Sequence, residues 1–123
     1  EALPFLKAAD RSTITLMSSL AGKRGGPGIT AYSASKAAVI GMANSFALEL
    51  AALGIRVNAG CPGWIDTPLL GAMDPMMMAG IVMQIPKGRM GRPDELAELV
   101  RFLCGPESSY CNGDVFTASG GYA

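Results

Sequence analysis

The chain has 123 residues, with 10 Lys and Arg against 10 Asp and Glu, and it contains no His. Half of the residues are hydrophobic, which is enough for one small domain or half of a larger one and excludes a disordered tail. Zero net charge favours neither nucleic acid nor an acidic membrane as a partner. Without His, Ser/His/Asp and Cys/His triads are excluded and no imidazole metal site is available, so we expect no metal.

The cysteines Cys61, Cys104 and Cys111 are an odd number and form no CxxC pair. We therefore expect no disulfide framework, and a reducing, cytoplasmic location is the simpler interpretation. No uninterrupted apolar run reaches the ~18 residues of a membrane helix, so no membrane contact is expected. The first residues show no signal peptide and no initiator Met, which suggests an excerpt from a longer protein.

Helices and strands are predicted to alternate along the chain. A helix ends within 1–9, and a strand with a β-branched centre follows at 12–18. A Gly-rich loop over 21–30 leads to a long helix over 32–53, which Gly54 ends as a left-handed cap. A strand at 55–59, a Met-rich stretch at 71–90, a helix that starts at Pro93 and ends at 104–106, and a strand at 114–118 complete the chain. This order predicts a parallel sheet with right-handed crossovers.

The predicted helix over 32–53 is apolar on most of its sides. Its polar members Asn44, Ser45 and Glu49 form no continuous solvated face. A helix of this kind is buried on two sides. One side can pack on the sheet, and the other needs another helix or a second subunit. We therefore expect a homo-oligomer formed through this helix.

Tyr32 and Lys36 are four residues apart, so on a helix they share one face. An ammonium beside a phenol favours the phenolate, which suits a general acid/base, although such pairs are more often plain surface residues. Ser19 ends a predicted strand, and α/β folds bind ligands at the carboxyl ends of parallel strands. Its hydroxyl could donate to a substrate oxygen. Alternatively, Ser18 and Ser19 only end the strand and cap the loop.

Several segments, taken in order and spacing, resemble the short-chain dehydrogenase/reductase family. They are Met-Ser-Ser-Leu-Ala-Gly at 17–22, Tyr-Ser-Ala-Ser-Lys at 32–36, Gly-Ile-Arg-Val-Asn at 54–58, Cys-Pro-Gly-Trp-Ile-Asp-Thr-Pro at 61–68, Gly-Arg-Pro at 91–93, and the Gly-rich end at 113–121. The resemblance covers nearly the whole chain. It implies an α/β, Rossmann-like parallel sheet with flanking helices, the second half of a doubly wound fold.

The same resemblance implies catalytic roles for three residues. Tyr32 would be the acid/base, Ser19 would orient and polarise the carbonyl, and Lys36 would support Tyr32 and hold the nicotinamide ribose. Family likeness also implies contacts to NAD or NADP, the implied cofactor, from Pro62, Gly63, Ile65 and Thr67, besides Tyr32 and Lys36. The implied reaction is hydride transfer between the nicotinamide and a small-molecule carbonyl or alcohol.

The chain departs from the family at its dinucleotide site. Family members open with a Gly-rich turn after the first strand, which cradles the pyrophosphate, and this sequence has none in that place. We therefore expect residues 1–123 to be the C-terminal catalytic half, with the pyrophosphate-binding half absent. The alternatives to an oxidoreductase are a truncated, non-catalytic oligomerising module and a half-subunit that needs a partner chain.

Other residues carry weaker expectations. The Met residues at 73, 76, 77, 78 and 83 fall where the family carries its mobile substrate lid, and ordinary core packing on short helices is an equal alternative. Trp64 could line the same pocket or simply pack. Arg89 and Arg92 are expected to make loop and helix-cap contacts rather than to bind phosphate.

Overall fold

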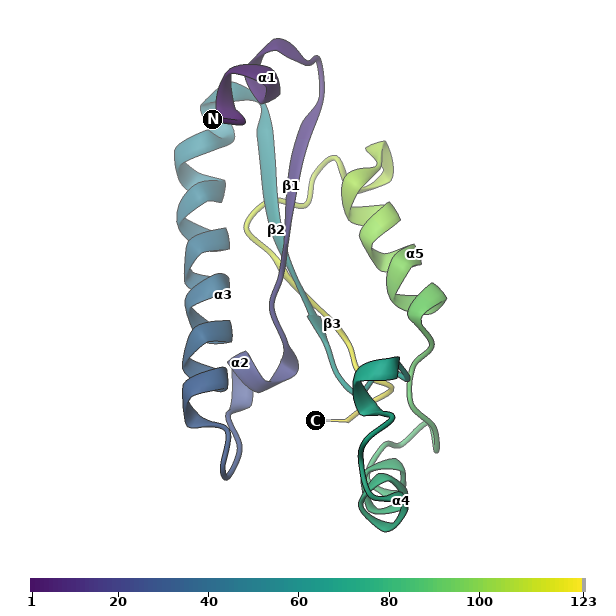
Figure 1. Ribbon diagram of the computed structural model, residues 1–123. Coiled ribbons are helices and arrows are strands. Elements are labelled where there is room, and N and C mark those ends of the chain that lie inside the picture. The colour runs from purple at the N-terminus through teal and green to yellow at the C-terminus, as the bar shows by residue number, and fades with distance from the viewer. Residues whose placement is uncertain (123) are drawn as a thin grey trace.

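The computed structural model describes residues 1–122 and contains one three-stranded parallel sheet in the order β1-β2-β3 (Figure 1). The strands are β1 (Ser12–Met17), β2 (Ile55–Pro62) and β3 (Val115–Ala118). The helices are α1 (Leu3–Ala8), α2 (Leu20–Arg24), α3 (Thr30–Leu50), α4 (Pro75–Met83) and α5 (Pro93–Cys104). Short 3₁₀ turns occupy Ala51–Leu53, Pro68–Leu70 and Pro106–Ser108. The predicted Rossmann-like parallel sheet is confirmed.

Helices cover both faces of the sheet. Figure 1 shows α3 on one side of the strands and α5 on the other. On the α3 side, the core is formed by the buried Ala43 and Ala47 of the helix against Val57 and Ala59 of β2. Four small side chains let the helix approach the sheet closely, and Ile14 and Leu16 of β1, with Phe46, Leu50 and Val115, fill the margin.

The α5 side is held by polar contacts as well as by packing. Arg56 of β2 donates from its guanidinium to the carbonyls of Leu103 and Gly105 at the end of α5, at 3.4 and 3.0 Å. A cation at a helix C-terminus neutralises the partial negative charge of the last carbonyls. The ring of Phe102 meets that of Phe116 edge to face, with 6.3 Å between centroids. These contacts fix the C-terminal end of α5 against β2 and β3.

Three predicted boundaries are wrong in detail. Strand β2 continues three residues beyond the expected end, to Pro62, because it pairs in register with β3 up to Ala118. The segment predicted as a loop after β1 starts with the short helix α2, which Ser19 caps. Helix α3 begins at Thr30, two residues early, and its last turn before Gly54 is a 3₁₀ turn. Gly54 has the predicted left-handed conformation, with φ at 73°.

The outer side of α3 remains uncovered in this chain. Met42, Leu48 and Leu53 are exposed, and Leu48 keeps 84% of its surface. The expectation of burial on two sides is therefore met on the sheet side only. By length and composition alone, the 24 helical residues Thr30–Leu53 could cross a membrane. No uninterrupted apolar run of that length is present in this helix, because polar residues such as Lys36 interrupt it.

Candidate active site

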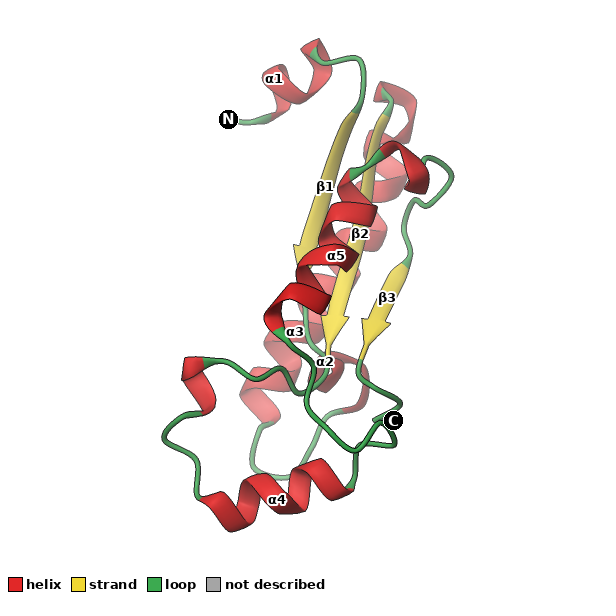
Figure 2. Cartoon of the chain, turned by 90° about the vertical axis from the view of Figure 1, so that its right-hand side faces the viewer, coloured by secondary structure: helices red, strands yellow, loops and turns green. Residues whose placement is uncertain are grey.

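The carboxyl ends of the three strands meet at one edge of the sheet, where the sequence-predicted site residues gather. Ser18 and Ser19 follow β1, Gly63 follows β2, and Ser119 follows β3. Helix α2 and the first turns of α3 lie at the same end of the molecule, and α4 lies beyond them (Figures 1 and 2). This is the edge at which open α/β sheets bind ligands.

Ser19 is the N-cap of α2. Its backbone is extended, with φ −158° and ψ 156°, and its Oγ accepts a hydrogen bond from the Ala21 N–H at 3.2 Å. Ser19 therefore caps helix α2, and its role toward a substrate stays a prediction. The hydroxyl proton remains available for a substrate oxygen, because the cap uses the oxygen only as an acceptor. Ser18 is buried, and its Oγ donates to the Lys36 carbonyl at 2.7 Å.

Lys36 ties the start of α3 to the end of β1. Its Nζ donates to the Met17 carbonyl at 3.1 Å and lies 5.9 Å from the centre of the Tyr32 ring. The Tyr32 side chain lies on the same helical face and keeps 49% of its surface exposed. The Tyr32 carbonyl accepts from the Ser35 hydroxyl at 2.7 Å, which fixes this turn. Tyr32 and Lys36 thus lie together at the edge where Ser19 begins α2.

Close approach of backbones explains how α2 is seated on α3. A Cβ atom on Gly22 would lie 2.7 Å from the Lys36 carbonyl carbon and 2.9 Å from the Ala37 nitrogen. Only Gly fits at such a distance from backbone atoms. Gly22 therefore sets the position of α2, and with it that of Ser19, relative to Lys36.

The four other predicted cofactor contacts lie along the segment that leaves β2. Pro62 ends the strand opposite Ala118, and the N–H of Gly63 donates to the Ala118 carbonyl at 2.9 Å. Ile65 forms a parallel bridge with Gly91. Thr67 begins the 3₁₀ turn at Pro68–Leu70, and its hydroxyl makes no capping hydrogen bond. The segment runs from the sheet edge toward α4.

A cavity of about 150 Å³ opens beside this segment. Trp64 and Ile65 line it together with Ala118 and Ser119 at the end of β3. Arg89 from the loop before α5 and Glu95 from the first turn of α5 complete this side. Trp64 thus lines a cavity, but none of the Met residues at 73, 76, 77, 78 and 83 lines it, so a place of Trp64 in the pocket under the Met lid stays a prediction. The cavity is adjacent to the Ile65–Gly91 bridge and separates the candidate cofactor segment from α5.

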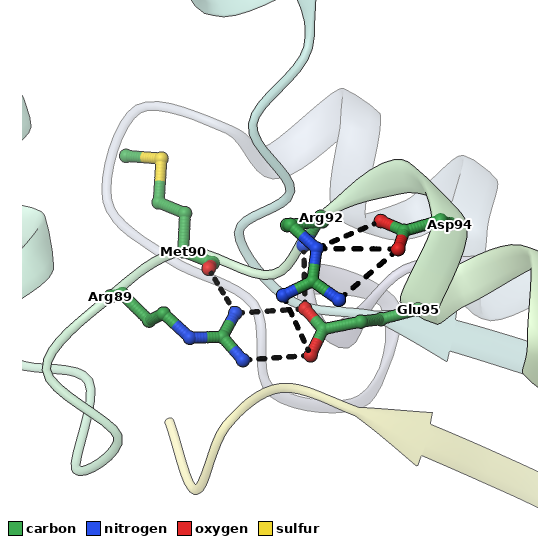
Figure 3. A network of polar contacts seen from close by, with 5 residues as sticks. All are labelled: Arg89, Met90, Arg92, Asp94 and Glu95. Atoms are coloured by element: carbon green, nitrogen blue, oxygen red, sulfur yellow. Dashed lines mark hydrogen bonds and ion pairs between the residues drawn. The ribbon is translucent and has the colours of Figure 1, made fainter.

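Arg89 and Glu95 form the strongest ion pair of the site region. Both guanidinium nitrogens of Arg89 donate to the Glu95 carboxylate, at 2.7 and 2.8 Å, and the Arg92 backbone N–H donates to the same carboxylate at 2.8 Å (Figure 3). The hydrogen bonds from Arg89, and then that from Arg92, lower the pKa of Glu95 to about 2. Arg92 also pairs with Asp94 at 3.0 Å. The predicted loop and cap roles of Arg89 and Arg92 are confirmed.

The Met-rich stretch forms a lone helix rather than core. Asp74 caps α4 by accepting from the backbone N–H groups of Met76 and Met77, at 2.9 and 3.1 Å. Met76, Met77 and Met83 are exposed, whereas Met73 and Met78 are half-buried. The core alternative is therefore wrong for the three exposed residues.

Some members of the site were not predicted from the sequence. The Met17 carbonyl that holds Lys36 is a backbone group and leaves no trace in the residue pattern. Lys23 of α2 donates to the Thr117 hydroxyl at 3.0 Å across the end of the sheet. The Arg89–Glu95 pair could have been inferred from opposite charges on either side of the predicted helix start at Pro93.

The three parallel strands, the helices on both faces and the ligand edge define a Rossmann-like fold. The family model described as enoyl-(acyl carrier protein) reductase matches residues 1–123. The chain belongs to the short-chain dehydrogenase/reductase family.

Curated relatives and solved structures agree with this assignment. The 3-oxoacyl-(acyl-carrier-protein) reductase FabG of Thermotoga maritima is 42% identical over 119 residues, which are 97% of this chain and 48% of that protein. The acetoacetyl-CoA reductase of a Synechocystis strain is 44% identical over 89% of this chain and 46% of its own length. The crystal structure of a 3-oxoacyl-(acyl-carrier protein) reductase from Brucella melitensis superposes with a TM-score of 0.92 at 37% identity, over 98% of this chain and 46% of that one. The chain therefore spans about half the length of the relatives it matches.

Proposed function

We propose that this chain carries the catalytic residues of an NAD(P)-dependent oxidoreductase that interconverts a carbonyl and an alcohol. In this proposal residues 1–123 are the C-terminal catalytic half of a Rossmann-type domain. The names of the relatives make 3-oxoacyl thioesters the first substrates to assay. The observation that supports the proposal most directly is the hydrogen bond from Lys36 Nζ to the Met17 carbonyl. It holds the helical face of Tyr32 and Lys36 at the end of β1, which Ser19 follows.

The groups at the edge suit a nicotinamide ribose. A ribose presents hydroxyls that need donors and acceptors, and Lys36 has three N–H bonds of which one is used on Met17. Tyr32 and Thr67 add hydroxyls, and the Thr67 hydroxyl is not used in capping. Lys36, Tyr32 and the segment of Pro62, Gly63, Ile65 and Thr67 would hold the nicotinamide side of the cofactor. When bound, the dinucleotide supplies or takes the hydride.

The chain's own residues then position the substrate oxygen and transfer the proton. The Ser19 hydroxyl donates a hydrogen bond to the carbonyl oxygen and favours the charge that develops on it. The Tyr32 hydroxyl gives its proton to that oxygen in reduction and takes it back in oxidation. The Lys36 ammonium lies 5.9 Å from the centre of the Tyr32 ring and brings a positive charge to the same edge.

The test is Tyr32→Phe in the full-length protein that contains this chain. Because the ring is kept and only the hydroxyl is lost, turnover should fall about 10²–10⁴-fold, whereas binding of the reduced dinucleotide should weaken much less, since Lys36 and the segment after β2 remain. Turnover is followed by NADH or NADPH absorbance, and binding by nucleotide fluorescence. Tyr110→Phe is the matched control, since Tyr110 is fully exposed and lies outside the candidate site. Unchanged turnover of the Tyr32 variant would refute the role.

The second candidate function is a non-catalytic oligomerising module. The uncovered apolar side of α3, with Leu48 84% exposed, favours it. We propose a homo-oligomer through α3 in either case. Turnover followed by NADH or NADPH absorbance distinguishes the two functions. A non-catalytic module shows no turnover with any carbonyl substrate, even when the protein is unmutated.

A further inference from the structure

Two adjacent cations, Lys23 and Arg24, reach from α2 to the end of β3. Lys23 Nζ donates to the Thr117 hydroxyl at 3.0 Å, and the guanidinium carbon of Arg24 lies 5.5 Å from the centre of the Tyr122 ring. Strand β2 lies between β1 and β3, so both side chains span its carboxyl end. They are held over the ligand edge of the sheet, where Figure 1 shows α2 and the C-terminal end of the chain together.

In the part of the chain that the structure describes, these two cations take part in no ion pair. Within residues 1–122, the ion pairs join Arg89 and Arg92 to the first turn of α5 and Arg101 to Glu98. Neither Lys23 nor Arg24 has a carboxylate within 4 Å in that range. An anion bound here would meet positive charge without a competing carboxylate.

The helix dipole alone explains only part of this arrangement. Cations in the last turn of a helix interact favourably with its carbonyls, and Lys23 and Arg24 occupy the last turn of α2. That interaction requires only that the two side chains are positively charged, and it requires no contact with a strand. The reach of both side chains to Thr117 and Tyr122 orients their charge over the sheet edge instead.

We propose that Lys23 and Arg24 bind an anionic group of the substrate, a carboxylate or a phosphate, that lies beyond the reacting carbonyl. The inference rests on the proposed function, since it concerns the same site. Lys23 lies four residues after Ser19, and one residue advances a helix by about 1.5 Å, so the anion subsite begins about 6 Å along α2 from the residue that polarises the carbonyl. Both residues are exposed, and Lys23 uses only one of its three N–H bonds, on Thr117, so both cations can make a charge-assisted hydrogen bond.

The experiment compares anionic and neutral substrates on the full-length protein and on the double variant Lys23→Gln with Arg24→Gln. One pair is 4-oxocyclohexanecarboxylate and its methyl ester. The other is acetoacetyl coenzyme A and the acetoacetyl thioester of N-acetylcysteamine, which lacks phosphate. Lys7→Gln, an exposed Lys of α1 at the opposite end of the molecule, is the control. Calorimetric binding of coenzyme A and of cyclohexanecarboxylate gives a readout that needs no turnover.

The double variant should raise the KM of the anionic substrate of one pair about tenfold. The kcat value and the KM of the neutral substrate of that pair should be unchanged. The affected pair identifies the group as carboxylate or phosphate. If the double variant raises the KM of the dinucleotide and leaves the KM values of both substrate pairs unchanged, the cations bind the dinucleotide and the inference is wrong. Equal KM values for anionic and neutral substrates in the unmutated protein would also overturn it. If the unmutated protein turns over none of these substrates, the proposed function is wrong. Calorimetric binding alone then decides whether the anion subsite exists.

Discussion

Gly22 is the residue on which the geometry of the candidate site depends most directly. A Cβ there would lie 2.7 Å from the carbonyl carbon of Lys36, a backbone atom that cannot turn away. Gly22→Ala should therefore push α2 away from α3 and destabilise the protein by about 1–3 kcal/mol, as overpacking does. Urea unfolding of the full-length protein measures the loss. The same displacement moves Ser19, so turnover should fall as well.

Gly41→Ala is the matched control for Gly22. Gly41 also lies in a helix, and a Cβ built on it meets no atom within 4 Å. In this open position Ala should stabilise α3 by about 0.5–1 kcal/mol, because Gly is the poorer helix former. If both substitutions change the free energy of unfolding equally, the contact between α2 and α3 does not limit the stability of the protein.

At the scale of elements, the start of α5 depends on the charge of Glu95. Hydrogen bonds from Arg89 and Arg92 lower its pKa from 4.5 to about 2 in the folded protein. A carboxylate with a depressed folded pKa stabilises the protein above its unfolded pKa, and this contribution is lost as the pH falls toward the folded value. Glu95→Gln should therefore lower the urea midpoint at pH 7, and the difference from the unmutated protein should shrink between pH 4.5 and 2.

The ion pair of Glu98 with Arg101 provides the comparison for this pH series. Both side chains are about two-thirds exposed, and the pair lies on the outer surface of α5. Glu98→Gln should change the midpoint little at any pH, since solvent screens exposed pairs. A Glu95 variant whose deficit stays constant down to pH 3 would contradict a stabilising role of the charge.

Elements with a strong local signal could be predicted from the sequence. Gly54 ends the long helix and Pro93 starts the last one, because each residue favours one backbone conformation at that place. Helix α2 was missed, since its five residues are followed by glycines and its start depends on the Ser19 cap. The end of β2 was also missed, because register with β3 rather than local preference extends the strand to Pro62.

The candidate site was predictable to the level of residue types but not of contacts. The spacing of Tyr32 and Lys36 gave their common face, and the strand order gave the edge at which Ser19 lies. The roles of these residues stay predictions. The bond from Lys36 to the Met17 carbonyl and the reach of Lys23 to Thr117 join segments far apart in the chain. Such contacts depend on the packed fold and have no local pattern.

At the scale of the whole molecule, the proposed homo-oligomer would form through the uncovered outer side of α3. Met42 and Leu48 are exposed on this helix. Leu48→Glu places a charge in the middle of this apolar side without touching the sheet core at Ala43 and Ala47. The variant should stay folded and form a smaller oligomer, because burying an unpaired carboxylate in an interface is costly.

Light scattering on the full-length protein measures this change in oligomer size, and far-ultraviolet circular dichroism checks the fold. Leu69→Glu is the matched control, because Leu69 is equally exposed, at 87%, but lies in the turn before α4. If Leu69→Glu alone changes the oligomer, the interface includes the α4 region and not α3. If neither does, the apolar side of α3 is covered within the same chain, by the half that the longer relatives have in addition. The two variants therefore distinguish an interface between subunits from packing inside one subunit.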